Sequence, residues 1–239
     1  EIVRTGSRGL YWLEPMIEVE TAAGRIAYGP VQPEDVGGLF DRLLDGGPHP
    51  LRLGRPEDIP FLKRQTRFTF ARCGIIDRQS LADYRAHGGL AGLSRALSLG
   101  PAAIIEEVTK SGLRGRGGAG FRTGIKWKTT ADAPAAQKYI VCNADEGDSG
   151  TFADRMIMEG DPFVLIEGMT IAAIAVGATQ GYIYIRSEYP HAIAVMNDAI
   201  VAARRGGMLG KKIASSSHVF DLEVRVGAGA YVCGEETSL

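Results

Sequence analysis

A glycine-rich segment with interspersed basic and aromatic residues is the part of this sequence best suited to binding a ligand. Residues 112–127 contain six glycines, three arginines and one lysine. Glycine has no Cβ atom, so backbone N–H groups of such a loop can approach a phosphate group or a planar ring closely. A flexible surface loop is the alternative interpretation. The residues that we expect to line a ligand here are Gly115, Arg116, Gly117, Gly118, Ala119, Gly120, Phe121 and Lys126.

Two aromatic residues and one lysine give this segment further binding chemistry. Lys126 is a point charge that can pair with a phosphate group. Phe121 and Trp127 can each stack on a flat ring, although ordinary core packing is an equally good interpretation of Trp127.

A second polar segment follows a predicted strand that ends near Cys142. Amide and carboxylate groups suit a polyol or a ring with hydrogen-bond donors and acceptors, and a carboxylate at Asp148 can accept from ribose hydroxyls. A solvated acidic loop is the alternative. The candidate ligand residues of this segment are Asn143, Asp145, Glu146 and Asp148.

A third polar segment, residues 227–237, follows another predicted strand. Its candidate residues are Gly234, Glu235 and Glu236. The two glutamates also suit the negatively charged start of a helix, which the helix dipole favours. That interpretation is compatible with a ligand role for one of them.

The elements that must position these segments alternate between strands and helices. Apolar runs predict strands, and the segments between them have the length and capping residues of helices. This order predicts an α/β fold with a Rossmann-like parallel sheet and with ligand loops at the carboxyl ends of its strands. The predicted elements are strand 138–142, helix 161–178, strand 181–186, helix 188–205 capped by Ser187, and strand 219–226.

The first 60 residues are predicted to be organised separately from the rest. Residues 1–45 contain a hairpin pattern followed by a capped amphipathic helix. Residues 46–60 are rich in Pro and Gly and are predicted to be a linker. Residues 61–239 then form the ligand-binding domain. We expect the chain to be part of a longer polypeptide, because it begins without Met and ends within a predicted helix.

The overall composition argues against several classes of protein. The 239 residues carry a net charge of −1, from 27 basic and 28 acidic residues, so no nucleic-acid partner is expected. No apolar run is long enough to span a bilayer, so no membrane association is expected. The three widely spaced cysteines form no metal-binding pattern and indicate reduced thiols in the cytoplasm. The residues alone therefore predict an α/β domain that binds a phosphorylated planar cofactor, either FMN or a nicotinamide nucleotide.

Four motifs, at residues 112–121, 124–127, 142–146 and 233–237, together resemble one family. It is the FMN-containing, NADH-binding flavoprotein subunit of respiratory complex I, NAD-reducing hydrogenases and NAD-dependent formate dehydrogenases. The resemblance implies that the loop 115–120 and Lys126 line the FMN phosphate and ring. It implies further that Asn143, Asp145, Glu146, Gly234 and Glu235 hold FMN, while Phe121, Asp148 and Glu236 contact NAD.

Within this family, residues 147–155, 159–163 and 177–182 most resemble the beta subunit of bacterial molybdenum formate dehydrogenases. This resemblance implies a cytoplasmic complex with a molybdenum-containing alpha subunit and a small 2Fe–2S subunit as partners. The equivalent subunit of a hydrogenase or of complex I is the alternative within the family. A scaffold that has lost its flavin is the alternative from another class, and the intact binding residues argue against it.

The sequence also departs from the family in three places. Arg122 stands where members often have proline. The family's 4Fe–4S cluster is expected in the full-length subunit, but its cysteine run is absent from these residues. Residues 1–45 resemble part of a thioredoxin-like 2Fe–2S domain in which Ser7 and Tyr11 occupy cysteine positions, so no cysteine-ligated cluster is expected there.

Overall fold

The structure, a computed structural model, describes residues 2–22, 24–43, 48–231 and 233. The chain forms two compact units. Residues 7–71 make up one, called here the small unit; the other, the main unit, consists of the chain up to Gly6 and from Arg72 onward. Each unit has its own core, and each is described separately below.

The small unit is a three-stranded antiparallel sheet with one helix of more than two turns. The predicted hairpin is formed by β1 (Ile17–Thr21) and β2 (Gly24–Tyr28), and β2 also pairs with β3 (Arg52–Gly54). Helix α1 (Val36–Leu43) follows a 3-10 turn whose start is stabilised by reciprocal hydrogen bonds between Gln32 and Asp35.

Strand β3 lies within the segment expected to be a linker. The Pro and Gly content of residues 46–60 led to that expectation, but Leu51 and Leu53 pack against apolar clusters of the small unit. Burial of these leucines outweighs the turn-forming composition, so the described part of this segment belongs to the sheet and its surroundings. A short helix, α2 (Pro60–Lys63), then ends the regular structure of this unit.

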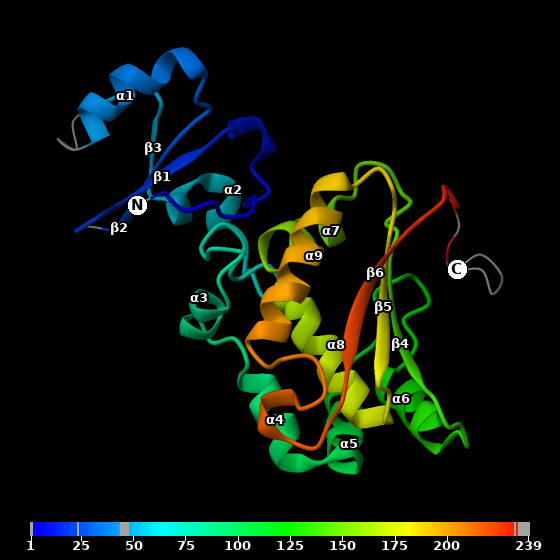
Figure 1. The fold of residues 1–239 in the computed structure, drawn as a ribbon. Coiled ribbons are helices and arrows are strands. Elements are labelled where there is room, and N and C mark those ends of the chain that lie inside the picture. The colour runs from blue at the N-terminus through cyan, green and yellow to red at the C-terminus, as the bar shows by residue number, and fades with distance from the viewer. Residues whose placement is uncertain (1, 23, 44–47, 232, 234–239) are drawn as a thin grey trace. The chain divides into compact units, whose positions relative to one another are not determined.

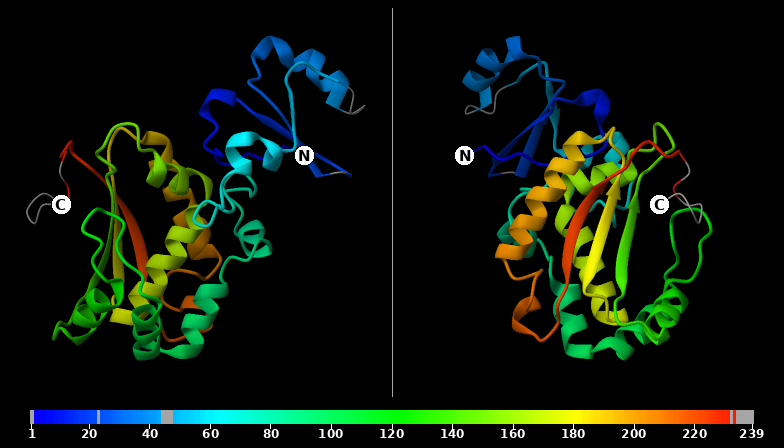
Figure 2. Two further views of the ribbon diagram at one scale, coloured as in Figure 1. Left: turned by 180° about the vertical axis from the view of Figure 1, so that it is seen from behind. Right: turned by 45° about the vertical axis from the view of Figure 1, so that its right-hand side comes forward.

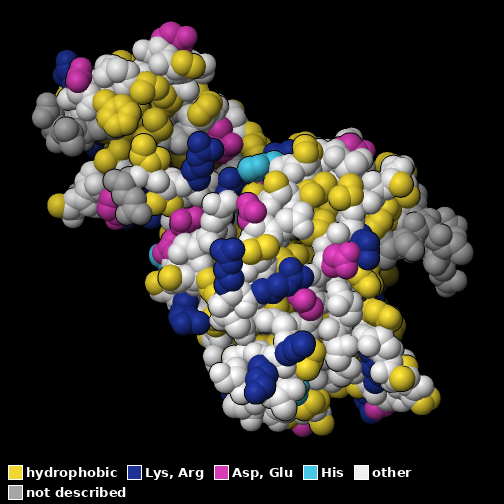
Figure 3. Space-filling model, in the orientation of Figure 1, with side chains coloured by type: hydrophobic (Ala, Val, Ile, Leu, Met, Phe, Trp, Pro, Cys, Tyr) yellow, Lys and Arg dark blue, Asp and Glu magenta, His cyan; other side chains and the backbone are white. Residues whose placement is uncertain are grey.

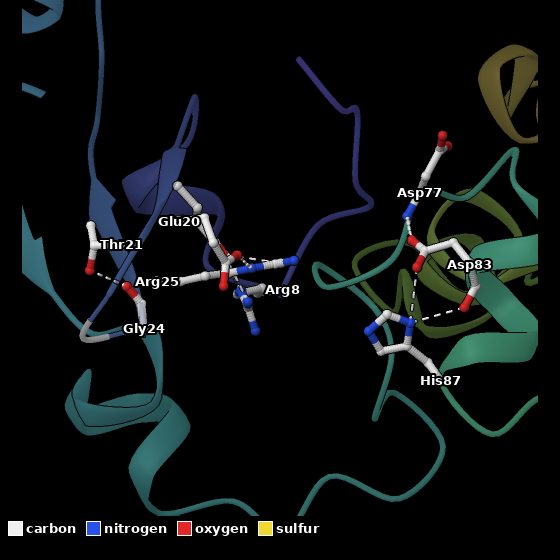
Figure 4. Close-up of polar contacts among 9 residues, drawn as sticks. Arg8, Glu20, Thr21, Gly24, Arg25, Asp77, Asp83 and His87 are labelled. Atoms are coloured by element: carbon white, nitrogen blue, oxygen red, sulfur yellow. Dashed lines mark hydrogen bonds and ion pairs between the residues drawn. The ribbon is translucent and has the colours of Figure 1, made fainter. Parts of the chain in front are cut away.

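A buried ion pair ties the start of the small unit to its hairpin. Arg8, whose side chain is only 6% exposed, donates from Nη2 to Glu18 Oε2 at 2.9 Å. Arg25 reaches the same carboxylate at 3.7 Å and also pairs with Glu20 at 3.0 Å (Figure 4). Removing either partner of the Arg8–Glu18 pair would leave a buried, unpaired charge and so destabilise the small unit.

The main unit is built on a parallel sheet of three strands in the order β4, β5 and β6 (Figure 1). These strands are β4 (Tyr139–Ala144), β5 (Gln180–Ile185) and β6 (Asp221–Val226). The connections between them contain α7 (Ala153–Gly160), α8 (Pro162–Val176) and α9 (Pro190–Arg205). The predicted α/β class with a parallel sheet is confirmed.

One face of this sheet is covered and the other is largely open. Helices α8 and α9 pack against the sheet on one side, where Ile183, Ile185 and Leu222 enter the core (Figure 2). On the other side Tyr139 is 53% exposed and stacks with Tyr182 at 6.0 Å between ring centroids. The alternating burial along β5 follows from the two-residue repeat of a strand.

The remaining helices of the main unit are α3 (Leu81–Ala86), α4 (Ala91–Leu99), α5 (Pro101–Ser111) and α6 (Thr123–Asp132). Buried Glu167 of α8 connects two of them. It accepts hydrogen bonds from the Tyr84 hydroxyl at 2.5 Å and from the N–H groups of Leu90 and Leu93 at the start of α4. Nearby, His87 is held by Asp83, which also caps the turn at Asp77 (Figure 4).

Two details of the main unit concern its boundaries. Helix α9 begins at Pro190, two residues later than the predicted cap at Ser187 implies, because proline favours the first helical position and restricts the residue before it. Gly6 lies directly against Gly160 at the end of α7, where a Cβ on Gly6 would stand 2.2 Å from the Gly160 Cα atom.

Two further observations concern the distribution of charge on the surface and the length and polarity of the helices. Basic and acidic side chains are interspersed on the face shown in Figure 3. Of the helices in the described ranges, none is both long enough and apolar enough to cross a membrane.

Candidate functional site

The carboxyl ends of the three parallel strands bring three loops together. Ala144, Ile185 and Val226 are in register across the sheet, so the loops that follow them start side by side. A small cavity of about 90 Å³ lies among these loops. It is lined by Asp145, Gly147, Arg186, Glu188, Gly229, Ala230 and Tyr231.

Two of the predicted residues lie at the carboxyl end of β4, Asn143 within the strand and Asp145 in the loop that follows it. Asp145 is 5% exposed and its N–H donates to Asn143 Oδ1 at 3.2 Å. Asn143 itself is exposed on the open face of the sheet. Burial and the nearby Asp145 carboxylate raise the pKa of the Cys233 thiol, and burial raises that of Cys142 to about 12. Both thiols are therefore protonated at neutral pH.

The Glu146 side chain, which the sequence predicts to contact the ligand, is held by hydrogen bonds within the protein. Its backbone is in the left-handed region, with φ of +48°. Its carboxylate accepts from the N–H groups of Asp154 at 2.7 Å and Arg155 at 3.1 Å, and from the Tyr189 hydroxyl at 3.1 Å. Both oxygens are therefore engaged by the start of α7 and by Tyr189 inside the protein.

Arg186 is a site residue that the sequence reasoning missed. It donates from Nη1 to the Glu146 carbonyl at 2.9 Å and from Nη2 to Glu188 at 3.0 Å. This pairing lowers the pKa of Glu188 to about 2. Arg186 ends the predicted strand 181–186, at the edge where Asp145 was already expected, so its position in the sequence was a usable signal.

The first and third loops pack directly on each other. A Cβ on Gly147 would stand 2.6 Å from the Tyr231 carbonyl oxygen. The Tyr231 hydroxyl donates to Asp148 Oδ1 at 3.4 Å, and both side chains are exposed. Tyr231 was also missed, although it lies within the polar segment 227–237. The usable signal in the sequence was the position of this aromatic residue in a polar segment that follows a predicted strand.

The glycine-rich loop is closed at its base and open at its tip. The N–H of Gly115 donates to the Phe121 carbonyl and the N–H of Thr123 to the Leu113 carbonyl, each at 2.9 Å. Gly118 and Gly120 have φ angles of +116° and +61°, which residues other than glycine rarely adopt. Within the described ranges, the N–H groups of residues 116–119 donate to no other group.

Exposed cations surround this loop at the start of α6. Arg116, Arg122 and Lys126 are exposed and form no ion pair with another described residue. Unpaired N–H groups, three cations and a helix N-terminus form a donor set that fits a phosphate group. Phe121 is 53% exposed and available for stacking, whereas Trp127 packs against the core.

Close packing fixes the helix that follows the loop. A Cβ on Gly124 of α6 would stand 2.7 Å from the Thr109 Cα atom of α5. The backbones of the two helices are therefore in contact, and the glycine-rich loop between them has fixed ends.

Three predicted residues, Gly234, Glu235 and Glu236, lie outside the described residues. In the ranges that the structure describes, no group of three or more His, Cys, Asp or Glu side chains is arranged to hold a metal ion.

A family model described as the Nuo51 FMN-binding domain matches residues 108–239. The chain belongs to this family. The match includes all three polar segments described above. It also decides the question that the residues alone left open, because the cofactor of this domain family is FMN. The open, cationic glycine-rich loop is chemically suited to it.

Named relatives fall into two groups. The chain is 52% identical over 162 residues to a subunit of the NADH-quinone oxidoreductase of Aquifex aeolicus, covering 67% of this chain and 37% of the relative. It is 52% identical over 177 residues to the NADP-reducing hydrogenase subunit HndC of Solidesulfovibrio fructosivorans, covering 74% and 36%.

A further hydrogenase relative aligns over nearly the whole chain. The NAD-reducing hydrogenase HoxS subunit alpha of Cupriavidus necator is 44% identical over 237 residues, covering 97% of this chain and 38% of the relative. The solved NAD+-reducing [NiFe]-hydrogenase in the H2-reduced state matches with a TM-score of 0.55 and 29% identity, over 89% of this chain and 34% of that one. The chain thus spans little more than a third of the length of these relatives.

Proposed function

We propose that this chain is the FMN- and NAD(H)-binding part of a diaphorase flavoprotein subunit. Such a subunit exchanges hydride with NAD(H) and single electrons with iron–sulfur clusters, including a 4Fe–4S cluster in its full-length form. One observation carries the proposal. The glycine-rich loop and the loop 145–148 both lie within the residues that match the FMN-binding domain. Bound flavin supplies the redox chemistry, and the protein binds and orients it.

The roles proposed for individual residues follow from the loops that hold them. The glycine-rich loop 115–120 and Lys126 bind the FMN phosphate and ring through N–H groups and positive charge. Asn143 and Asp145 accept hydrogen bonds from the polyol, and Phe121 stacks on nicotinamide. Asp148 accepts from a ribose hydroxyl of NAD. The contacts proposed for Gly234, Glu235 and Glu236 rest on the family resemblance alone.

Glu146 is proposed to act indirectly. The sequence assigned its carboxylate to the flavin, but that carboxylate caps α7. In this proposal it fixes the loop from which Asp145 and Asp148 approach the ligand.

The finer proposal is that the subunit belongs to a formate dehydrogenase. The sequence of residues 147–182 supports this choice. The partners would then be a molybdenum-containing alpha subunit and a small 2Fe–2S subunit of a cytoplasmic complex. Formate would be oxidised in the alpha subunit, and electrons would reach this subunit through iron–sulfur clusters.

An NAD-reducing hydrogenase is the second candidate, and one observation favours it over complex I. The alignment with the hydrogenase HoxS subunit alpha covers 97% of the chain and therefore includes the small unit. The alignment with the NADH-quinone oxidoreductase relative from Aquifex aeolicus covers only 67%. The small unit is thus shared with this hydrogenase subunit, whereas the alignment with the hydrogenase subunit HndC covers only 74% of the chain.

The test uses the full-length subunit and its native complex. The purified subunit should show a flavin absorbance spectrum and oxidise NADH with ferricyanide as acceptor, with no formate activity when alone. Absence of either flavin or NADH oxidation would refute the diaphorase proposal. Co-purification with a molybdenum subunit would support the formate assignment. Co-purification with a nickel–iron hydrogenase would replace that assignment and leave the diaphorase role intact.

A further inference from the structure

A buried tyrosine contacts residues of three segments near the cavity: the loop after β4, helix α7 and the residue that follows β5. Tyr189 immediately precedes α9 and is 7% exposed. Two guanidinium groups approach its ring, that of Arg155 at 5.7 Å and that of Arg186 at 5.3 Å from the ring centroid. Its hydroxyl donates to Glu146 Oε2 at 3.1 Å. Packing and cation–π contacts therefore hold the ring, and the hydroxyl has one defined acceptor.

The acceptor of this hydrogen bond has an unusual backbone conformation. Glu146 has a φ of +48°, which non-glycine residues keep only where their surroundings enforce it. Three groups hold its carboxylate: two N–H groups at the start of α7 and the Tyr189 hydroxyl. The Arg186 guanidinium holds its carbonyl oxygen at 2.9 Å. Of the three groups on the carboxylate, the Tyr189 hydroxyl is the one that belongs to a side chain.

This hydrogen bond persists over the working range of pH. Burial and the adjacent Glu146 carboxylate raise the pKa of Tyr189 to about 12. The hydroxyl is therefore protonated at neutral pH and remains a donor to a charged acceptor, the stronger class of hydrogen bond.

The position of Glu146 determines what Tyr189 can affect. Along the chain, Glu146 lies between Asp145, which lines the small cavity, and Asp148, which is proposed to accept from a ribose hydroxyl. A rotation of the Glu146 backbone out of the left-handed region would move both neighbouring carboxylates. The group that stabilises this conformation therefore controls how the loop 145–148 is presented to a nucleotide.

We propose that Tyr189 is a positioning residue for nucleotide binding, acting through Glu146, and this inference rests on the diaphorase function proposed above. Tyr189 touches neither flavin nor nucleotide. Its loss should loosen the loop that carries Asp148 and so weaken NADH binding. The hydride step takes place at the flavin, so its rate should change little once the nucleotide is bound.

The test is Tyr189→Phe in the full-length, flavin-loaded subunit, assayed with NADH and ferricyanide. The variant keeps the ring and its cation–π contacts and removes only the hydroxyl. We expect KM for NADH to rise about five- to tenfold. This is less than the full effect of losing a hydrogen bond to a charged group, because Tyr189 acts on the nucleotide through Glu146. The kcat should change less than about twofold, and flavin content should be unchanged.

Tyr182→Phe is the matched control. Tyr182 is a half-buried tyrosine of β5 that stacks with Tyr139 on the open face of the sheet. Loss of the Tyr182 hydroxyl should leave the KM for NADH within about twofold of the parent value, because this hydroxyl is not part of the network around Glu146. A double-mutant cycle with Glu146→Ala, which removes the acceptor, tests the route. If Tyr189 acts through Glu146, adding Tyr189→Phe to Glu146→Ala should raise KM no further.

Several outcomes would overturn the inference. One is a KM for Tyr189→Phe equal to that of Tyr182→Phe. Another is additivity with Glu146→Ala, which would exclude the route through Glu146. A fall in flavin content with unchanged KM in the loaded fraction would show a structural role only. A parent subunit that binds flavin but does not oxidise NADH would instead refute the diaphorase function, which keeps the two failures distinct.

Discussion

The glycine-rich loop and the loop 145–148 both carry groups proposed to bind the cofactors, yet their supports differ. The tip of the glycine-rich loop is exposed, and its N–H groups donate to no other group in the described ranges. The loop 145–148 is held by Arg186, by the start of α7 and by Tyr189. One loop has its conformation fixed at the base only, and the other along its length.

This difference separates two ways of building a binding site. Groups held in place before the ligand arrives lose little conformational entropy on binding, so their contacts contribute more of their energy to affinity. Groups in a glycine-rich tip must be ordered by the ligand, which lowers affinity but lets the backbone approach closely. We therefore expect substitutions in the fixed loop to affect stability, and substitutions in the open loop to affect flavin affinity.

The largest expected effect is that of Gly147→Val in the fixed loop. A Cβ at this position would stand 2.6 Å from the Tyr231 carbonyl oxygen. We expect the free energy of unfolding to fall by about 3 kcal/mol, the upper end of the usual cost of overpacking. Urea denaturation measures this. Gly168→Val is the control, because Gly168 is exposed on α8 with open space around its Cβ position. Equal stability of the two variants would contradict a fixed loop.

Gly118→Val should have a smaller effect on folding and a clear effect on flavin. Gly118 has a φ of +116° but no atom within 4 Å of its Cβ position. The strain of about 1–3 kcal/mol can relax in the open loop without ligand, but not with it bound. We expect flavin affinity to fall about tenfold or more while the stability of the flavin-free protein is unchanged.

Titration with FMN followed by fluorescence measures this affinity. Gly207→Val is the control, because it places the same kind of strain, at φ of +73°, outside the site. Retention of stoichiometric flavin by the Gly118 variant would show that the glycine-rich loop does not bind it.

Asp148→Gly tests whether the end of the fixed loop selects the nucleotide. A carboxylate near the ribose repels a 2′-phosphate and accepts from a free 2′-hydroxyl. We expect the preference for NADH over NADPH, measured as the ratio of kcat/KM values, to fall about three- to tenfold. An unchanged ratio would remove Asp148 from the nucleotide site.

The smallest effect concerns the ion pair between Arg186 and Glu188. Arg186 lowers the pKa of Glu188 to about 2, from an ordinary value of 4.5. The contribution of this ion pair to stability is therefore present above pH 4.5 and is lost as the pH falls toward 2. The parent and Glu188→Gln should differ slightly in Tm at pH 6 and converge near pH 2. Because Glu188 is exposed, the difference should shrink in high salt. A difference that grows on acidification would contradict this sign.

The sequence predicted the architecture of the main unit well. The three strands lie within two residues of the expected ranges, because short apolar runs between helical segments leave few alternatives. The start of α9 was placed too early because a polar cap at Ser187 was weighted above Pro190. In the small unit, β3 was expected to be linker, because its flanking Pro and Gly residues obscured Leu51 and Leu53.

For the candidate site, the sequence indicated which segments meet but not which atoms are engaged. The parallel topology placed Asp145 at a strand end, and the structure has it there. The engagement of Glu146 was not predictable, because it depends on where α7 starts and on Tyr189, which is 43 residues away. Arg186 and Tyr231 were missed because their contacts with Glu146 and Asp148 join residues that are 40 and 83 positions apart in the chain.

The contact between Gly6 and Gly160 has a practical consequence for dividing the chain. Residues up to Gly6 belong with the main unit, although residues 7–71 form a unit of their own. The small unit is thus inserted into the main unit rather than placed before it. A fragment starting at Arg72 would leave the end of α7 without the backbone that packs on Gly160. A better boundary would keep residues 1–6 and join them to Arg72 through a short flexible linker.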